Sequence, residues 1–269
     1  MRVHLDDPMS VGPEESAGFK VGNRILARAE LRQTYELKLA RTRDDIRAAQ
    51  SLRFQVFNLE LNEGLEQSFA TCLDADPFDD VCEHLLVEDT ANGGIVGTYR
   101  LQMGDKAVAN RGFYSAQEFD FTPYQPIQKQ IVELGRACVH RDHRNLAVLS
   151  LLWRGIYAYA RERGGRYLIG CSSLTSQDPV EGASMYQELK RKHLVDAPFQ
   201  TNPLPAVACP LDQVSKKAPK VPKLLGAYLA VGAKITGPPA IDREFKTIDF
   251  LTFLDLISLP ESTVRRYLT

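Results

Sequence analysis

An apolar stretch, IVELGRACV at residues 131–139, carries a glutamate and an arginine in its middle. A carboxylate in a buried strand is costly unless it is paired, hydrogen-bonded or used in chemistry. Glu133 is therefore a candidate general base, and the alternative is a structural ion pair with Arg136. Strict alternation places the two residues on opposite faces of a strand. Gly135 between them favours a β-bulge, which would turn both toward one cleft and free a backbone N–H for a reacting carbonyl oxygen.

A basic turn follows this strand, HRDHRN at residues 140–145, and leads into the apolar helical pattern LAVLSLLW. Free N–H groups and the positive end of a helix dipole make such a turn a candidate anion site. The glycines that would bring a diphosphate very close are missing, so the turn is less specific than a phosphate-binding loop.

Charged residues earlier in the chain each have two interpretations. Asp74 and Asp76 either bind a cationic acceptor group or belong to a solvated acidic loop. Arg53 and Arg100 either anchor that loop or hold the acceptor. His84, at the start of a strand, is either a hydrogen-bonded structural residue or a catalytic one.

The composition excludes several classes of protein. The 269 residues carry a formal net charge of −1, whereas a dominant nucleic-acid role normally needs a strongly basic balance. The cysteines are odd in number and form no C-x-x-C pair, which indicates reduced thiols and predicts no metal site. Cysteines in apolar strands, such as Cys138 and Cys171, are usually inert. The N-terminus does not resemble a secretory signal, and no apolar run reaches transmembrane length, so we expect a cytoplasmic protein.

Hydrophobic periodicity divides the chain into strands and helices. Residues 1–33 have little periodicity and are expected to form an N-terminal arm, followed by a single domain over 34–269. Strands are expected at residues 35–40, 84–89, 94–103, 131–140, 167–174 and 247–256. Helices are expected after a capping box at Thr42 and Asp45, and over residues 148–163, 179–192 and 222–233. A hairpin followed by alternating strands and helices predicts one α/β domain on a mixed sheet.

This order of elements resembles the GNAT acyltransferase fold, in which helices flank a mixed, mostly antiparallel central sheet. The turn after the central strand of that fold is normally R-x-x-G-x-G/A and holds the pantetheine and pyrophosphate of coenzyme A. The matching positions here are Arg144, Ala147 and Leu149, so the arginine is present and the glycines are not. The resemblance therefore implies a GNAT-like fold with a weakened coenzyme A pyrophosphate site.

A closer resemblance is to the GNAT-fold N-acyl amino acid synthases and lyso-ornithine lipid acyltransferases, which take acyl chains from acyl carrier protein. It covers about residues 34–256 and rests on the segments LRFQVFNLE, DADPFDDVCEHLLV, VGTYRLQ, ELGRACVHRDHRN, LLWRGI, YLIGCSSL and GAKITGPPAIDREFKTIDFLTFLDL. Acyl-homoserine lactone synthases are more distantly similar. They share an R-x-x-x-F pattern, two acids, an arginine on the hairpin and E-x-x-R, which correspond here to Arg53 with Phe57, Asp74 and Asp76, Arg100, and Glu133 with Arg136.

The resemblance implies an N-acyltransferase that moves a long fatty acyl chain, with or without a 3-hydroxyl group, to the α-amine of an amino acid. The acceptor it implies is ornithine, and the product is a lyso-aminolipid. The donor is an acyl-pantetheine thioester, with acyl carrier protein preferred over coenzyme A. No metal or redox cofactor is implied.

The resemblance also implies roles for individual residues. Glu133 would take the proton of the attacking amine, directly or through water, and Tyr186 would protonate the leaving thiolate. Arg136 would hold the glutamate ionised or grip the carboxylate of the acceptor. The remaining substrate-binding candidates are Arg53, Asp74, Asp76, Arg100 and His84. The candidates for acyl-donor binding are Val139, Arg144, Asn145, Leu146, Ala147, Val148 and Leu149.

Two other functions fit the same resemblance: an acyl-homoserine lactone synthase-like enzyme and a non-catalytic acyl-carrier sensor. Basic clusters at residues 190–193 and 215–223 are either docking points for acidic acyl carrier protein or ordinary solvated surface. No nucleic-acid partner is expected. Any membrane contact is expected to be peripheral, at the inner face and through the lipid product.

Overall fold

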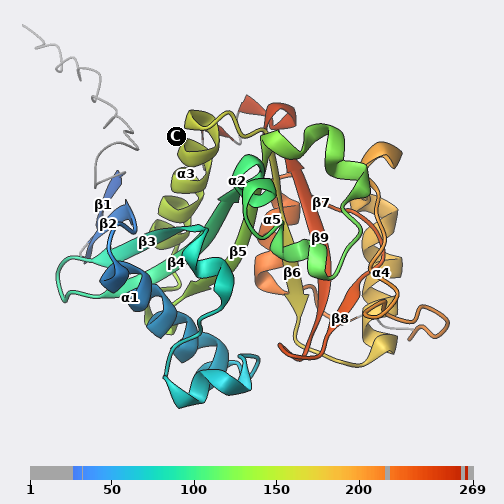
Figure 1. Ribbon diagram of the computed structural model, residues 1–269, viewed down its shortest axis with the longest axis horizontal. Helices are drawn as coiled ribbons and strands as arrows, with labels where there is room; N and C mark the ends of the chain where they lie inside the picture. Colours follow the sequence, from blue (N-terminus) through green and yellow to red (C-terminus); the bar gives the residue numbers. More distant parts are fainter. Residues whose placement is uncertain (1–26, 32, 216–218, 262–263, 266–269) are drawn as a thin grey trace, which may run out of the picture.

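A computed structural model describes residues 27–31, 33–215, 219–261 and 264–265, and the described strands form one sheet (Figure 1). The strand order is β1-β2-β3-β4-β5-β6-β9-β7, with β8 paired to β9. The β5–β6 pair is parallel and the other pairs are antiparallel. The strands are β1 (Ala27–Leu31), β2 (Gln33–Leu39), β3 (Glu83–Asp89), β4 (Ile95–Met103), β5 (Ile131–Val139), β6 (Tyr167–Leu174), β7 (Lys234–Ile235), β8 (Ala240–Asp242) and β9 (Thr247–Asp255). The prediction of a mixed, mostly antiparallel sheet is confirmed.

Five α-helices and several short helical turns connect the strands. The α-helices are α1 (Arg43–Arg53), α2 (Gly104–Ala109), α3 (Leu146–Glu162), α4 (Pro179–His193) and α5 (Lys223–Ala230). A π-helical segment, η1 (Phe54–Glu60), continues α1. The 3₁₀ turns are η2 (Glu66–Ala70), η3 (Pro77–Asp80), η4 (Tyr114–Gln117), η5 (Thr122–Gln130), η6 (Arg141–His143), η7 (Ala197–Phe199) and η8 (Leu256–Ser258). None of the described helices combines the length and the apolar character needed to cross a membrane.

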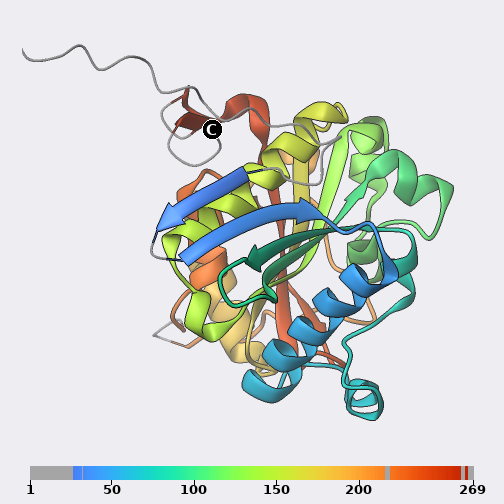
Figure 2. The same ribbon diagram turned by 90° about the vertical axis from the view of Figure 1, so that its left-hand side faces the viewer.

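The two faces of the sheet are covered by different elements. Leu85 and Val132 pack with Leu152 of α3 in the largest core cluster. On the other face, Leu52 and Val56 join a small apolar cluster from α1 and η1. Figure 2, which views the sheet from its β1 edge, shows α1 and α3 on opposite sides of the strands. Strand residues that face α3 are therefore separated by the sheet from those that face α1 and the turns.

Most helices and strands begin and end within a few residues of the positions predicted from the sequence. The capping box at Thr42 and Asp45 is formed, and Gly164 adopts a positive φ of 73° where α3 ends. α3 begins two residues earlier than expected because the side chain of Asn145 caps it by accepting a hydrogen bond from the Val148 N–H. Three strands were missed, namely β1, β7 and β8, the last two being too short to show alternation.

The N-terminal arm lies mainly outside the described residues, since the structure describes none of residues 1–26. Residues 27–31 fall within the range expected as an arm, yet they form the edge strand β1 and pair with β2. The sheet therefore begins before residue 34. The single domain from that point remains a prediction, which the one continuous sheet supports.

Candidate active site

A cavity of the described structure lies where β5 and β6 part. Their parallel pairing ends at Glu133 and Ile169. A side chain at Gly170 would collide with the carbonyl oxygen of Leu134, so glycine alone allows the strands to touch at this point. Beyond it, residues of both strands line a cavity of about 780 Å³.

This cavity has an apolar half and a polar half because it passes between the faces of the sheet. Leu134 faces α3 and α5, whereas its neighbour Glu133 faces the turns, as alternation requires. The apolar half includes Tyr99, Leu134, Leu149, Leu152, Leu224 and Tyr228. The polar half includes Tyr114, Ser115, Glu133, Arg136, Asp242 and Asp249.

Glu133 lies at the junction, with its carboxylate held by two backbone N–H groups. The N–H groups of Tyr114 and Ser115 donate to its two carboxylate oxygens, each at 2.8 Å. Burial raises the pKa of Glu133, although these N–H groups and the charge of Arg100 oppose the shift. A buried carboxylate with a raised pKa that borders a cavity is suited to general-base catalysis. No ion pair joins it to Arg136 among the described residues, so the structural alternative is not formed.

The expected β-bulge is present and lies next to Gly135. Arg100 pairs with Gly135 and Thr98 with Cys138, so Arg136 and Ala137 together face a single residue of β4. Arg136 itself adopts the left-handed region with a φ of 49°, where a glycine would be the usual residue. Its guanidinium lies over the rings of Tyr114 and Phe245, at 4.9 and 4.3 Å from their centroids. These contacts and its ion pairs hold the strained residue in place.

Arginines and aspartates alternate around a closed, buried ring, which we call the charged ring. Its members in order are Arg53, Asp74, Arg136, Asp76, Arg100 and Asp79, which returns to Arg53. The ion-pair distances run from 2.6 to 3.3 Å. Burial acts to raise the pKa of Asp79, but Arg53 and Arg100 outweigh it and hold that pKa far below its usual value. Burial also acts to raise the pKa of Asp76, but Arg100 and Arg136 outweigh it and lower that pKa.

The charged ring decides between the alternatives for these residues. The side chains of Asp74 and Asp76 are only 1% and 10% exposed and both form ion pairs with Arg136, so the interpretation of a solvated acidic loop is not supported. The aspartates already have guanidinium partners, and the arginines anchor the loop beneath β4 and β5. His84 is buried too, with its Nε2 3.3 Å from the carbonyl oxygen of Asp79, and burial lowers its pKa. Direct contact of Arg53, Asp74, Asp76 or His84 with an acceptor stays a prediction, and none of these four lines the cavity.

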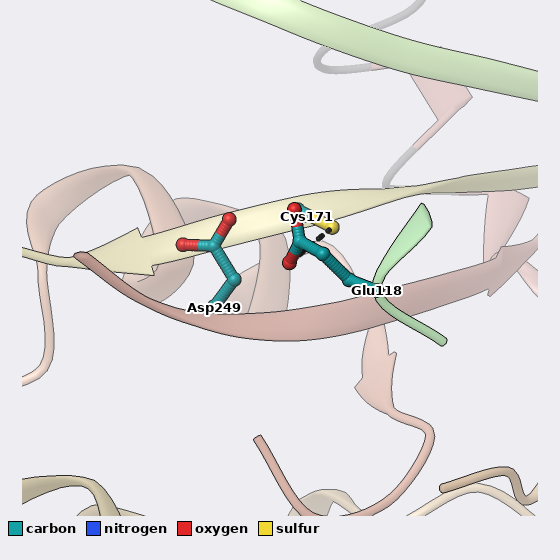
Figure 3. A group of neighbouring side chains, drawn as sticks. All are labelled: Glu118, Cys171 and Asp249. Carbon is teal, nitrogen blue, oxygen red and sulfur yellow. Dashed lines mark hydrogen bonds between the residues drawn. The ribbon is translucent and has the colours of Figure 1, made fainter. Parts of the chain in front are cut away.

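Figure 3 shows two further buried acids, Glu118 and Asp249, beside Cys171. Together with the partly buried Asp242, whose charge raises the pKa of both, they form what we call the acidic cluster. Glu118 follows η4, Asp249 lies on β9, and the thiol of Cys171 on β6 points at Glu118 from 4.0 Å. Burial and the charges of Asp249 and Asp242 raise the pKa of Glu118 to about 9. Burial likewise raises the pKa of Asp249 to about 6. Glu118, Cys171 and Asp249 offer ligand atoms within 4.8 Å of one another.

The acidic cluster was not predicted from the sequence. Asp249 had the same signal as Glu133, an acid inside an apolar strand, in TIDFLTFLDL. Glu118 had no signal of its own, since it follows a short turn and only the fold brings it to β9.

The turn predicted to bind the donor borders the apolar half of the cavity. Val139, Arg144, Asn145, Leu146 and Leu149 line it, and Ala147 and Val148 pack into the core instead. Both Nη atoms of Arg144 bind Glu60, at 2.6 and 2.8 Å, and its Nε donates to the Val139 carbonyl at 3.0 Å. The arginine that would hold a phosphate is thus neutralised within the chain.

Comparison with known proteins connects this geometry to a family. A model of the acetyltransferase (GNAT) domain matches residues 52–154. The L-ornithine N(alpha)-acyltransferase of Agrobacterium fabrum is 34% identical over 249 residues, which cover 87% of this chain and 85% of that protein. The enzyme of the same name from Brucella abortus is 33% identical over 252 residues, covering 86% and 88%. The chain belongs to the L-ornithine Nα-acyltransferase family.

Membership of this family makes the chain a GNAT acyltransferase, as the sequence predicted. The crystal structure of the AHL synthase LasI superposes with a TM-score of 0.51 and 10% identity, over 87% of this chain and 96% of that one. Such low identity shows a shared fold alone. The family resemblance, and not the AHL synthase one, extends to sequence.

Tyr186, the predicted proton donor, lies away from the cavity. Tyr186 on α4 packs against the core cluster of Met185 and Leu189, with Lys190 over its ring, and does not line the cavity. Its role as the proton donor therefore stays a prediction, and this position does not support it. The prediction rested on the family resemblance, which does not fix which side of α4 meets a cavity.

Proposed function

We propose that this enzyme transfers a long fatty acyl group from a pantetheine thioester to the α-amine of ornithine. The named activity of its relatives supports the reaction. The observation that carries it is the single cavity in which an apolar half and a polar half meet at Glu133. An acyl chain fits the side lined by Leu149, Leu152 and Tyr228, and an amine fits the side lined by carboxylates.

Glu133 is the proposed base. The α-ammonium gives a proton to its carboxylate, and the free amine attacks the thioester carbonyl carbon. A C–N bond forms and the C–S bond breaks as the proton on Glu133 passes to the leaving thiolate. The nitrogen of the tetrahedral intermediate loses its second proton to water, so the products are the amide, a thiol and one proton released to solvent. The raised pKa suits this exchange, because a strongly acidic carboxyl group would not accept the amine's proton.

Backbone N–H groups near the bulge are the proposed stabilisers of the tetrahedral oxyanion. From Leu134 onward β5 has lost β6 as a partner, and Gly135, Arg136 and Ala137 line the cavity. N–H groups that point into a cavity are what a developing oxyanion needs. Arg136 would raise the local positive potential, although its guanidinium is held by Asp74 and Asp76.

The donor we propose is acyl carrier protein in preference to coenzyme A. Arg144 is bound by Glu60, and the Asn145 side chain occupies an N–H of the first turn of α3. Little remains there to bind a pyrophosphate. Acyl carrier protein thioesters should exceed matching coenzyme A thioesters in kcat/KM by at least about tenfold, or 1.4 kcal/mol.

An acceptor panel tests the function against its alternatives. The enzyme is incubated with a long-chain acyl carrier protein thioester and with ornithine, neutral amino acids or S-adenosylmethionine, and products are identified by mass spectrometry. Acylated ornithine is expected. Acyl-homoserine lactone would favour the synthase interpretation, and binding of the thioester without any product would favour a sensor.

The family's lipid product also bears on where the enzyme works. A single long chain gives reversible membrane affinity, so the product would partition into a bilayer. We propose that the enzyme acts at the cytoplasmic face of the membrane through peripheral contact, and that residues 34–269 form one catalytic domain.

A further inference from the structure

The polar half of the cavity holds more carboxylates than the reaction needs. Glu133 alone suffices as a base, yet Asp242 and Asp249 also line the cavity and Glu118 lies behind them against Cys171. Glu118 and Asp249 are each only 6% exposed. None of the three acids has an ion-pair partner among the described residues.

The basic residue whose charge reaches this cluster already forms ion pairs elsewhere. Arg136 is the basic residue whose charge lowers the pKa of Glu118, and it forms ion pairs with Asp74 and Asp76 of the charged ring. The other acids around Glu118 are Asp249, Asp242 and Glu133, which all raise its pKa. Buried like charges without a partner are unstable, so a bound cation would relieve this cluster.

A second feature of the cavity points to a ligand independently of the acids. Gln102 lies opposite Glu133 in the β4–β5 register, on the same face of the sheet. Its side chain is 2% exposed and lines the cavity, and neither its amide oxygen nor its amide nitrogen has a hydrogen-bond partner in the described structure. Buried amides are rarely left unpaired, so this one is aimed at a polar group that the ligand would bring.

A continuous polar strip joins the two features. The Ser115 side chain hydrogen-bonds both the carboxylate of Glu133 and the thiol of Cys171. The sulfur of Cys171 is in turn 4.0 Å from Glu118. Ser115 and Cys171 thus connect the base to Glu118, and Figure 3 shows Cys171 beside Glu118 and Asp249. A ligand bound here would carry a reactive amine at one end and a second positive charge at the other.

We propose that the acidic cluster of Glu118, Asp242 and Asp249 binds the side-chain ammonium of the amino-acid acceptor, while Gln102 binds its α-carboxylate beside Glu133. The inference rests on the proposed function and adds the basis of its selectivity: the site accepts an amino acid whose side chain carries a positive charge. A charged group in a buried site discriminates strongly against an analogue that lacks it, because the carboxylates are then left unpaired.

Norvaline is the matched probe, since it has the carbon skeleton of ornithine without the terminal amine. Binding of each amino acid is measured by titration calorimetry with the wild type and with Asp249→Asn, Gln102→Leu and Asp120→Asn. Asp120 is an exposed acid two residues from Glu118 and serves as the charge control. The wild type should bind ornithine roughly 10- to 100-fold more tightly than norvaline.

The variants should separate the two parts of the site. Asp249→Asn should remove most of the preference for ornithine, Gln102→Leu should weaken both ligands about equally, and Asp120→Asn should change neither. Equal affinity of the wild type for both amino acids, or an unchanged preference in Asp249→Asn, would overturn the inference. A stoichiometric metal ion found in the purified protein by elemental analysis would do so as well.

The same experiment separates this inference from the proposed function. Because binding is measured without a donor, it decides the inference whether or not turnover occurs. Failure of the wild type to acylate ornithine would overturn the proposed function alone. Acylation of ornithine and norvaline with equal kcat/KM would leave the acyltransferase intact and contradict the inference.

Discussion

Two groups of buried acids lie on the same face of the sheet and differ in almost every electrostatic respect. In the charged ring each aspartate has an arginine on either side, and the pKa values of Asp76 and Asp79 are lowered. In the acidic cluster the carboxylates have no such partners, and the pKa values of Glu118 and Asp249 are raised to about 9 and about 6. Burial is the largest influence on all of them, so the difference comes from the partners.

The contrast distinguishes acids that stabilise the fold from acids that are available to a substrate. A complete set of partners leaves no capacity for a ligand, and the charged ring accordingly anchors a loop. In the described part of the chain the acidic cluster lacks cationic partners, borders the cavity and is available to a substrate. Tyr114 connects the charged ring to the base: its ring lies against Arg100 and Arg136, and its N–H donates to Glu133.

Replacing the base should give the largest effect on catalysis. Glu133→Gln keeps the size of the side chain but cannot accept a proton, so kcat/KM should fall by about 10²- to 10⁴-fold. The melting temperature should fall modestly, because the amide nitrogen cannot accept the hydrogen bond that one of the Tyr114 and Ser115 N–H groups donates to the carboxylate. Glu83→Gln, the same change outside the cavity, should stay within about twofold of the wild type. Near-normal turnover in Glu133→Gln would make this glutamate structural.

Breaking the charged ring should cost stability instead. Arg53→Met leaves Asp74 and Asp79 short of a buried partner and should lower the free energy of unfolding by about 3–5 kcal/mol, measured with urea. Asp249→Asn removes an unpaired buried acid and should leave stability unchanged or raise it by up to about 1 kcal/mol. The contrast between the two groups is refuted if both variants lose the same free energy of unfolding.

The two groups should affect the pH dependence of stability in opposite directions. The acidic cluster should lower stability as pH rises, and the charged ring should lower it as pH falls. Glu118 has a pKa of about 9 when folded and an ordinary value of 4.5, so its contribution to the unfolding free energy falls as pH rises between them. The slope from one such group is at most about 1.4 kcal/mol per pH unit. Asp79 has a lowered pKa, and its stabilisation is present above its ordinary value of 3.8 and lost as pH falls through the lower folded value.

Urea titrations across pH would test this assignment. Glu118→Gln should flatten the decline between about pH 4.5 and 9 and leave the acid limb unchanged. A variant with the wild-type profile over that range would show that Glu118 is not the group responsible.

Exposed charges should matter least. The basic clusters predicted to dock acyl carrier protein lie partly outside the described residues, since Lys216 and Lys217 fall there, whereas Arg191, Lys192 and Lys220 are exposed. Lys220→Glu should raise the KM for an acyl carrier protein thioester by up to about threefold at low salt, with the difference fading as salt is added. An equal rise for a small pantetheine thioester would show that the lysine acts on the cavity and not on docking.

Much of the fold was accessible from sequence because it rests on local signals. The Thr42 cap, the hairpin of β3 and β4 and the glycine after α3 all depend on neighbouring residues. Glu133 was found for a related reason, as an acid in an apolar strand. The closed ring was not foreseen, since it joins α1, the 74–79 loop, β4 and β5, and only the folded chain shows which arginine meets which aspartate.

The acidic cluster and Tyr186 both show that sequence patterns do not predict which distant residues meet in the fold. Glu118 is brought to Asp249 by the packing of a turn on β9, which no spacing in the sequence encodes. Tyr186 was predicted from the family resemblance and lies in a different core cluster. Patterns along the chain predict elements well, and they predict encounters between distant elements poorly.

The most direct test of the account is which amine of ornithine becomes acylated. With the side-chain ammonium held by the acidic cluster, only the α-amine reaches Glu133. Tandem mass spectrometry of the product made from an acyl carrier protein thioester distinguishes the two positions. The account predicts Nα-acyl-ornithine from the wild type; a product acylated on the side-chain nitrogen would contradict it.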